Sequence, residues 1–270
     1  MAEPDGSEAT SAEAPPSLTF GSHAWAFAKE LLIVVVGAII VASLLRAFVG
    51  QMFLIPSGSM ENTLRLQDRI VVEKLSAVER GEIVVFADPG GWLNESAAPE
   101  RGPVGRALEF VGVLPDTQTN YLTKRIIGLP GDQVACCDDR GRITVNGSPL
   151  DEGSYLYADP ASGPVAPSDI EFDVLVPAGR IFVMGDHRDD SRDSRCHLND
   201  PPASAGGNGV ATGDNAFVSE DFVVGRAVAV AWPADALRRL RIPATFAAVP
   251  GGRTPAPKQA EIEAGADADC

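Results

Sequence analysis

Two serines flank a glycine in the segment Ile55-Pro-Ser-Gly-Ser-Met60, directly after a long apolar run. Pro56 fixes its own φ and biases Ile55 toward an extended backbone, while Gly58 permits a tight bend. This arrangement would place the Ser59 hydroxyl at a surface, where a substrate can reach a nucleophile. A Pro-Ser-Gly-Ser segment is more often a plain loop, so catalytic chemistry requires a second group from elsewhere in the chain.

A lysine lies inside the segment Tyr121-Leu-Thr-Lys-Arg-Ile-Ile-Gly-Leu-Pro-Gly-Asp132, which has the pattern of a β-strand closed by a Pro-Gly turn. Lysines in strands usually point to solvent, and Lys124 taken alone fits that description. With its usual pKa of ~10.4 a lysine is protonated and cannot act as a base. If Ile126 and Ile127 help to desolvate Lys124, its pKa falls and the neutral amine can activate a serine hydroxyl.

A third polar stretch follows the apolar strand Arg180-Ile-Phe-Val-Met-Gly185. It reads Asp186-His-Arg-Asp-Asp-Ser-Arg-Asp-Ser-Arg195 and places acids and bases around two serines. Such a run is usually a solvated loop. Because it directly follows a buried strand, it can equally form a hydrogen-bonded wall of a site.

In their order and spacing, these three segments resemble the successive boxes of bacterial type I signal peptidases, in particular the actinobacterial type. These are membrane-bound Ser/Lys proteases that remove signal peptides from exported preproteins. The resemblance covers about residues 31–233 and includes a further matching strand, Gly81–Phe86. It implies a membrane-anchored serine endopeptidase that cleaves after small residues in an Ala-X-Ala-like pattern.

The resemblance also implies roles for individual side chains. Ser59 would be the nucleophile and Lys124 the general base. Ser57 would help the Ser59 backbone N–H form the oxyanion hole, and Ser191 would orient Lys124. The remaining implied residues are a structural group near the site (Asp193 and Arg195 as an ion pair, Arg125, Asp186) and a substrate-binding group (Ile55, Pro56, Met60, Leu122, Thr123). Neither a cofactor nor a metal is implied.

An apolar run must carry these groups to the membrane. Residues 31–55 contain a single charged residue, Arg46, and as a helix they would be about 37 Å long at ~1.5 Å per residue. That length crosses a hydrocarbon core of ~30 Å with tilt, and Trp25 and Lys29 precede it as interfacial residues. We therefore predict one transmembrane helix over residues 25–55. A buried core helix or a cleaved signal sequence fits less well, because the run lacks a polar face and a cleavage site.

The rest of the chain favours short strands and turns, since it contains 27 glycines and 21 prolines and only 6% aromatic residues. We predict a mainly β architecture, and the resemblance implies an antiparallel, coiled and partly barrel-like catalytic domain over residues 56–246. Loop-rich excursions are expected at 87–120 and 197–216. The polar tails, 1–24 and 247–270, are predicted to be disordered because they bury too little apolar surface.

A net charge of −15 argues against a nucleic-acid partner. The partners implied instead are the signal peptides of preproteins and the lipid bilayer. The Lys and Arg residues that flank the apolar run do not fix its orientation. The resemblance implies a single-pass protein of the plasma membrane, with residues 1–24 in the cytoplasm and the catalytic domain on the extracytoplasmic face.

One disulfide among the four cysteines is predicted from this compartment, which leaves two cysteines unpaired, one of them Cys270. Thiols tend to oxidise outside the cytoplasm, so Cys196 is expected to form a disulfide with Cys136 or Cys137. Zinc bound by these three cysteines and His197 is the alternative. It is disfavoured because the ligands would be adjacent in sequence, Cys136 to Cys137 and Cys196 to His197, which suits a tetrahedral site poorly.

The sequence also allows three alternatives: a different catalytic pair, a different protease and a non-catalytic module. His187 invites a Ser/His pair, although Lys124 already fills the role of the base. A repressor-type self-cleaving Ser/Lys protease would share the β-fold but lack the span at residues 31–55. A non-catalytic, membrane-tethered β module that binds a partner would not respond to substitution of Ser59.

Overall fold

The computed structural model describes residues 20–48, 50–93, 102–105, 120–201, 212–265 and 270. The chain divides into two compact units, Met1–Ala42 and Ser43–Cys270. The first unit is helical where it is described, and the second is built mainly of β-strands. Residues 1–19, most of the predicted N-terminal tail, lie outside the described residues, as do parts of the predicted excursions (94–101, 106–119 and 202–211).

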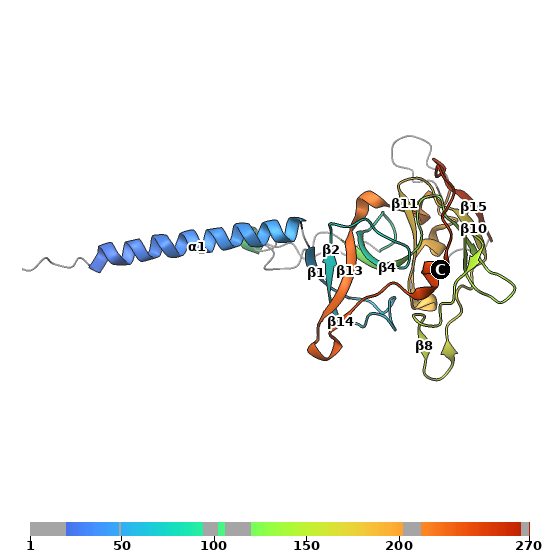
Figure 1. Cartoon of the computed structure of the whole chain (residues 1–270), viewed down its shortest axis with the longest axis horizontal. Helices are drawn as coiled ribbons and strands as arrows, with labels where there is room; N and C mark the ends of the chain where they lie inside the picture. Colours follow the sequence, from blue (N-terminus) through green and yellow to red (C-terminus); the bar gives the residue numbers. More distant parts are fainter. Residues whose placement is uncertain (1–19, 49, 94–101, 106–119, 202–211, 266–269) are drawn as a thin grey trace, which may run out of the picture. The chain divides into compact units, whose positions relative to one another are not determined.

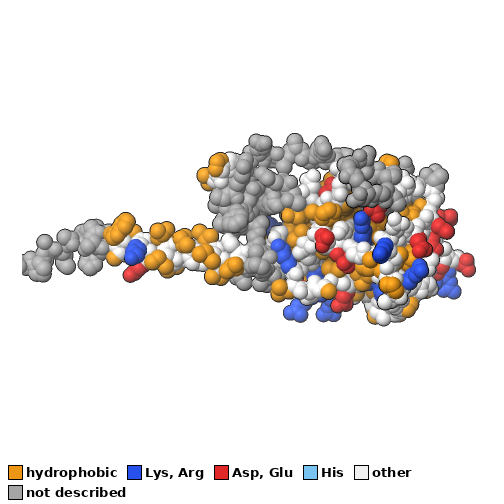
Figure 2. Space-filling model, turned by 90° about the horizontal axis from the view of Figure 1, so that it is seen from above, with side chains coloured by type: hydrophobic (Ala, Val, Ile, Leu, Met, Phe, Trp, Pro, Cys, Tyr) orange, Lys and Arg blue, Asp and Glu red, His pale blue; other side chains and the backbone are white. Residues whose placement is uncertain are grey.

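Helix α1 runs from Phe20 to Phe48. Its stretch Trp25–Leu44 is long and apolar enough to cross a membrane, and none of it is buried in protein. Figure 2 shows mainly hydrophobic side chains along the described part of this helix.

The predicted transmembrane helix, 25–55, begins where the candidate span begins, at Trp25, but its predicted end was wrong. Helix α1 itself begins inside the predicted tail, at Phe20, and ends at Phe48. Strand β1 (Gly50–Leu54) follows instead of further helix. A side chain at Gly50 would lie 2.5 Å from the carbonyl oxygen of Val72, so glycine allows the close approach that pairs β1 with β2.

The larger sheet has the strand order β1-β2-β13-β3-β4-β11-β12, with β14 paired to β13 (Figure 1). Its strands after β1 are β2 (Arg69–Glu73), β3 (Ile83–Ala87), β4 (Tyr121–Gly128), β11 (Arg180–Met184), β12 (Val218–Ser219), β13 (Val223–Trp232) and β14 (Arg238–Arg239). The strand pairs of the described residues are antiparallel, which confirms the predicted mainly β, antiparallel fold.

A second sheet has the order β15-β10-β5-β6-β7. Its strands are β5 (Gln133–Cys136), β6 (Thr144–Val145), β7 (Ser148–Pro149), β10 (Phe172–Leu175) and β15 (Glu261–Ala264), and β8 (Ala158–Asp159) pairs separately with β9 (Gly163–Pro164). Short 3-10 helices connect the strands: η1 (Arg188–Asp190), η2 (Ser194–His197), η3 (Asp214–Ala216), η4 (Glu220–Phe222), η5 (Ala234–Ala236) and η6 (Ala244–Ala248).

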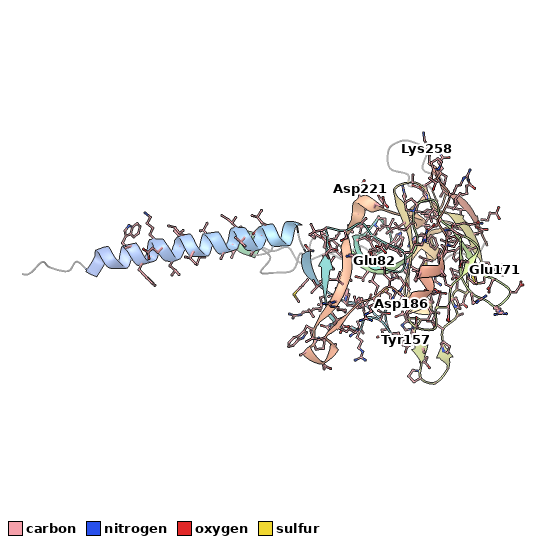
Figure 3. The ribbon with its side chains drawn as sticks, viewed as in Figure 1. Glu82, Tyr157, Glu171, Asp186, Asp221 and Lys258 are labelled. Carbon is pink, nitrogen blue, oxygen red and sulfur yellow. A yellow bond between two sulfur atoms is a disulfide. The ribbon has the colours of Figure 1, made fainter. Side chains whose placement is uncertain are left out.

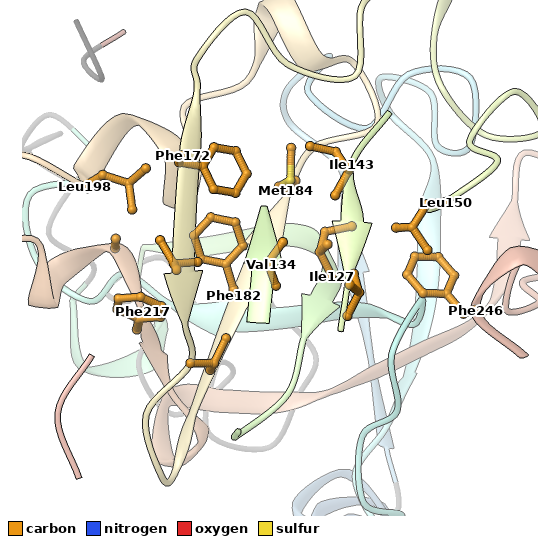
Figure 4. Packing of buried hydrophobic residues seen from close by; sticks show 14 of the residues in the cluster. Ile127, Val134, Ile143, Leu150, Phe172, Phe182, Met184, Leu198, Phe217 and Phe246 are labelled. Carbon is orange, nitrogen blue, oxygen red and sulfur yellow. The ribbon is translucent and has the colours of Figure 1, made fainter. Parts of the chain in front are cut away.

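The largest hydrophobic cluster joins the two sheets (Figure 4). Ile127 and Phe182 come from the first sheet, and Val134 and Phe172 from the second. Each is almost completely buried, and burying a side chain of this size is worth about 1.5–3 kcal/mol. This packing holds β4 and β11, the strands that bear the predicted catalytic segments, in a fixed position.

The C-terminal segment is folded, so the predicted disorder of residues 247–270 was wrong over the part that the structure describes. Strand β15 pairs antiparallel with β10, and its alternation of Glu and apolar residues packs Ile262 and Ala264 against the core. The backbone N–H of Arg253 donates a hydrogen bond to the carbonyl of Gly131 at 2.6 Å. The composition predicted that the β unit ends near Phe246, but the unit continues to β15.

The predicted disulfide between Cys196 and Cys136 or Cys137 was also wrong. Cys136 bonds to its neighbour Cys137, and Cys196 bonds to Cys270. The folded C-terminal segment supplies the partner that a disordered tail would not have kept close to Cys196. Because all four thiols are engaged in disulfides, the zinc alternative loses its thiolate ligands.

Candidate active site

Ser59 lies in the sharply turning segment that follows β1, and hydrogen bonds within this segment and from His187 fix its backbone. Backbone hydrogen bonds from Glu61 to Gly58 (2.8 Å) and from Leu64 to Met60 (2.7 Å) form consecutive tight turns around the serine. The Ser59 carbonyl accepts a hydrogen bond from the backbone N–H of His187 at 3.1 Å. Ser59 is 7% exposed, so its environment is largely desolvated.

Ser57 and Gly185 complete the surroundings of Ser59. The hydroxyl oxygens of Ser57 and Ser59 are 3.4 Å apart, within hydrogen-bond reach. A Cβ on Gly185 would lie 2.5 Å from the Ser59 carbonyl oxygen and would collide with the hydroxyl of Ser191. Glycine at position 185 therefore lets β11 end directly against both serines.

Lys124 lies in the middle of β4, opposite Val84 of β3, and is 3% exposed. Its amine donates a hydrogen bond to Ser191 Oγ at 2.8 Å. Burial lowers the pKa of Lys124 to about 8, an effect that the charge of Asp193 partly opposes and that of Arg195 reinforces. A useful fraction of neutral amine is therefore present near neutral pH.

Asp193 and Arg195 anchor the serine that binds the lysine. Ser191 donates to Asp193 Oδ2 at 2.8 Å, and Arg195 Nε and Nη2 each donate to Asp193 at 2.9 Å. Burial disfavours the ionised form of Asp193, but the charge and hydrogen bonds of Arg195, assisted by Lys124, outweigh it and lower the Asp193 pKa to about 2. Lys124, Ser191, Asp193 and Arg195 thus form one buried hydrogen-bonded series.

Arg125 and Asp186 form a second buried pair. Successive residues of a strand face opposite sides, so Arg125 points away from its neighbour Lys124. Its guanidinium binds Asp186 through two hydrogen bonds of 2.8 and 2.6 Å and lies 4.4 Å above the ring of Tyr155. Asp186, labelled in Figure 3, also accepts from the Thr63 hydroxyl at 2.5 Å, which ties the turn after Ser59 to the end of β11.

A pocket of about 260 Å³ brings the predicted residues together. Ser59 and Lys124 line it, as does Ser57. The five predicted substrate-binding residues, Ile55, Pro56, Met60, Leu122 and Thr123, also line it. Ser191, Asp193, Arg195, Arg125 and Asp186 do not line the pocket. Ser191 binds Lys124 and is itself held by Asp193, whereas Arg125 and Asp186 bind each other.

Five further residues line the pocket, and no individual role was predicted for four of them: Trp92, Leu93, Asp190 and Arg192. The fifth, Tyr121, begins the predicted strand that contains Lys124. Asp190 and Arg192 belong to the polar run 186–195, in which roles were predicted only for other residues. Trp92 lay in a predicted loop excursion, where one large aromatic residue after Pro89-Gly-Gly was the available signal.

The first half of β4 has a partner strand on only one side among the described residues. β3 pairs with β4 along its first half, but β11 pairs with it only from Arg125 to Gly128. Among the described residues, no strand pairs with Leu122 and Thr123 on the side away from β3. An extended peptide can hydrogen bond to such an edge and place alternate side chains in a pocket.

The ring of His187 does not face the pocket. It packs on Tyr157 with ring centroids 3.8 Å apart, and its Nδ1 lies 3.4 Å from Glu61 Oε2. Its backbone N–H, not its imidazole, is the group that contacts Ser59. This placement favours Lys124 over His187 as the base.

Comparison with known proteins agrees with this geometry. Residues 28–232 match the family described as signal peptidase, peptidase S26. The chain belongs to this family. It is therefore a serine peptidase of the S26 type, and the match ends at the last residue of β13. The C-terminal segment, with β15 and Cys270, lies beyond the matched residues.

Individual members of the S26 family are similar over much of their length. A probable signal peptidase I of Mycobacterium leprae is 36% identical over 223 residues, 76% of each chain. A signal peptidase I of Mycobacterium tuberculosis is 37% identical over 188 residues, 63% of each chain. A probable signal peptidase I-2 of Synechocystis is 34% identical over 227 residues, which cover 82% of this chain and 77% of the relative.

Proposed function

We propose that this S26 peptidase is a signal peptidase I that uses Ser59 as nucleophile and Lys124 as general base. It would cleave N-terminal signal peptides from exported preproteins after small residues. The observation that carries the assignment is the buried amine of Lys124. It lines the same pocket as Ser59, is bound by Ser191, and has a pKa lowered to about 8.

In the acylation step, Ser59 Oγ attacks the scissile carbonyl carbon while its proton passes to Lys124 Nζ. The oxyanion that forms accepts hydrogen bonds from the Ser59 backbone N–H and the Ser57 hydroxyl, and such donors are worth about 3–4 kcal/mol each. Lys124 then gives its proton to the leaving amine. Water repeats the attack on the acyl-enzyme, with Lys124 again as base.

The described residues contain no direct hydrogen bond between Ser59 and Lys124. The Lys124 amine instead binds Ser191, and Ser59 Oγ lies near Ser57 Oγ. Catalytic hydrogen bonds are often long before substrate binds and tighten in the complex. A preprotein that excludes water from the pocket would favour the shorter contact.

The substrate would lie extended along Leu122 and Thr123, with small side chains at positions −1 and −3 directed into the pocket. A volume of about 260 Å³ is below the ~300–1,000 Å³ of typical ligand sites, which suits small side chains. The neighbouring apolar residues Ile55, Met60 and Leu122 are buried and leave little room to adapt.

Helix α1 would anchor the enzyme as a single span of the plasma membrane and contact the lipid bilayer. The residues before it would be cytoplasmic, and the catalytic unit would lie on the extracytoplasmic face. The two disulfides support that side, because disulfides persist in oxidising compartments. Protease treatment of intact cells should digest the β unit, and its protection would contradict this topology.

The decisive experiment incubates the detergent-solubilised full chain with a preprotein and sequences the new N-terminus. Cleavage after a small residue, lost in Ser59→Ala, is the expected result. Cleavage by Ser59→Ala at the wild-type rate would remove Ser59 from the mechanism. A chain that binds the preprotein without cutting it would favour the non-catalytic tethered module.

A further inference from the structure

Trp92 forms the inner wall of the pocket that contains Ser59 and Lys124. Trp92 is 1% exposed, whereas the next residue, Leu93, is 37% exposed, and both line the pocket. Trp92 is therefore a buried lining residue of the pocket, and Leu93 is a partly exposed one. Leu122, 8% exposed, lines the same pocket and belongs to the same hydrophobic cluster as Trp92.

The backbone around Trp92 is fixed by one carboxylate. Asp88 accepts hydrogen bonds from the backbone N–H groups of Gly90 (2.9 Å), Trp92 (3.3 Å) and Leu93 (3.2 Å). The indole N–H of Trp92 donates to the carbonyl of Asn215 at 3.0 Å. The indole is therefore held at its backbone and at its polar edge.

Two other rings fix the plane of the indole. His197 stacks on it with ring centroids 4.7 Å apart and an interplanar angle of 11°, and Phe86 meets it edge to face at 5.7 Å. His197 Nδ1 lies 2.7 Å from Asp200 Oδ2, which also accepts from the Asn215 side chain at 2.9 Å. His197 is 2% exposed, and its Nε2 has no hydrogen-bond partner among the described residues.

We propose that Trp92 is a specificity-determining residue whose indole limits the size of the substrate side chain that the pocket accepts. His197 is the positioning residue that keeps the indole in that place. The assignment rests on the proposed function and deepens it. Because His197 and Phe86 pack against the indole, a larger substrate side chain would have to displace aromatic rings from a tightly packed cluster.

The test compares kcat/KM for peptide substrates that carry Ala or Leu at position −1 or −3. In Trp92→Ala, the Leu-to-Ala ratio of kcat/KM should rise by about 10-fold or more at one of these positions, because the pocket gains the volume of the indole. Trp92→Phe keeps an aromatic wall and should give a smaller rise. An active variant whose ratio equals that of the wild type at both positions would overturn the proposal.

Trp92→Ala also removes part of a buried cluster and therefore risks losing the fold. If it is inactive on every substrate, Trp92→Phe decides by the same ratio. Trp232→Ala is the matched control, because Trp232 is 54% exposed and does not line the pocket, and its ratio should equal that of the wild type. A rise in that control would show that the ratio does not report on the pocket, which would also overturn the proposal.

His197→Ala tests the positioning role. It should raise the Leu-to-Ala ratio less than Trp92→Ala does, and His197→Phe, which keeps a flat ring on the indole, should restore the wild-type ratio. A purely structural role would instead lower kcat/KM for both substrates by the same factor. A wild-type enzyme that cleaves no substrate would reject the proposed function as well, whereas an unchanged ratio in active variants rejects the role of Trp92 alone.

Discussion

The eight-stranded sheet bears Lys124 on β4 and ends β11 directly before the segment that contains Ser191, while the five-stranded sheet bears none of the pocket residues. Two larger hollows, of about 500 and 480 Å³, open on the second sheet. Acidic residues such as Asp173 and Glu263 line both, and neither hollow contains a predicted catalytic residue. Volume alone would therefore have selected a hollow other than the proposed active site.

The two sheets differ in whether their charged side chains are buried or exposed. In the first sheet, Lys124 and Arg125 of β4 are buried and hydrogen bonded, and burial lowers the pKa of Lys124. In the second, the charged residues of β15, Glu261 and Glu263, are exposed, and its apolar residues pack against the core. On the proposed function, the first sheet carries the chemistry and the second supports it through the shared hydrophobic cluster.

The largest effect should come from the dyad itself. Ser59→Ala and Lys124→Ala should each lower kcat/KM by roughly 10⁴-fold or more, and the double variant should be no worse, because the two groups act as one unit. Lys124→Arg should be equally inactive, since a guanidinium cannot be deprotonated to serve as base. Preprotein cleavage, with circular dichroism to verify folding, measures this.

His187→Ala is the control for the dyad, with near-normal activity expected because its ring faces Tyr157 and Glu61. An inactive His187→Ala beside an active Lys124→Ala would reassign the base.

Ser57→Ala should have a smaller effect, a fall in kcat of about 10²-fold or more with KM little changed. It removes one donor to the oxyanion but leaves the nucleophile and the base in place. Steady-state kinetics on one peptide substrate separate the two constants. A change confined to KM would assign Ser57 to substrate binding.

Much of this site follows from sequence because its parts are local. The strand that contains Lys124, its closing Pro-Gly turn and the polar run after Met184 are each short patterns with a physical reading. The resemblance of the three segments to those of type I signal peptidases then implies which of their residues meet. Sequence can identify which residues are hydrogen-bonded partners, but the distances, such as 2.8 Å from the Lys124 amine to Ser191 Oγ, come only from the structure.

The errors fall where structure depends on distant pairing. A continuous apolar run does not distinguish helix from strand, so the change at Gly50, which pairs with Glu73, was missed. The four residues of β15 carry too little pattern of their own and are ordered by β10, about 90 residues earlier. Trp92 owes its role to Phe86, His197 and Asn215, which no local pattern connects.

The pH dependence of cleavage should report the lysine. The reactive form is the neutral amine, so kcat/KM should fall about tenfold per pH unit below the pKa of Lys124, which burial lowers to about 8, and should level off above it. An acid limb near the unperturbed ~10.4 would mean that the amine is solvated during turnover, and one near ~6.5 would indicate a histidine.

The smallest effect on activity, and a large one on stability, is expected from the C-terminal disulfide. Cys270→Ser opens a loop with a sequence separation of 74 residues, for which the chain-entropy relation gives about 4 kcal/mol of unfolding free energy. The pocket residues stay in place, so kcat/KM of the folded variant should remain within about threefold of the wild type. Denaturant unfolding in detergent and peptide cleavage at low denaturant measure the two quantities.

The other disulfide provides the matched control. The double variant Cys136→Ser, Cys137→Ser breaks a bond between adjacent residues, which closes almost no loop and should change the unfolding free energy far less. If Cys270→Ser instead abolished cleavage while the β unit stayed folded, the disulfide would be holding the segment from Ser191 to Arg195 in its catalytic position. The C-terminal segment would then belong to the active site, because Cys196 directly follows Arg195, and the division of labour between the two sheets would be wrong.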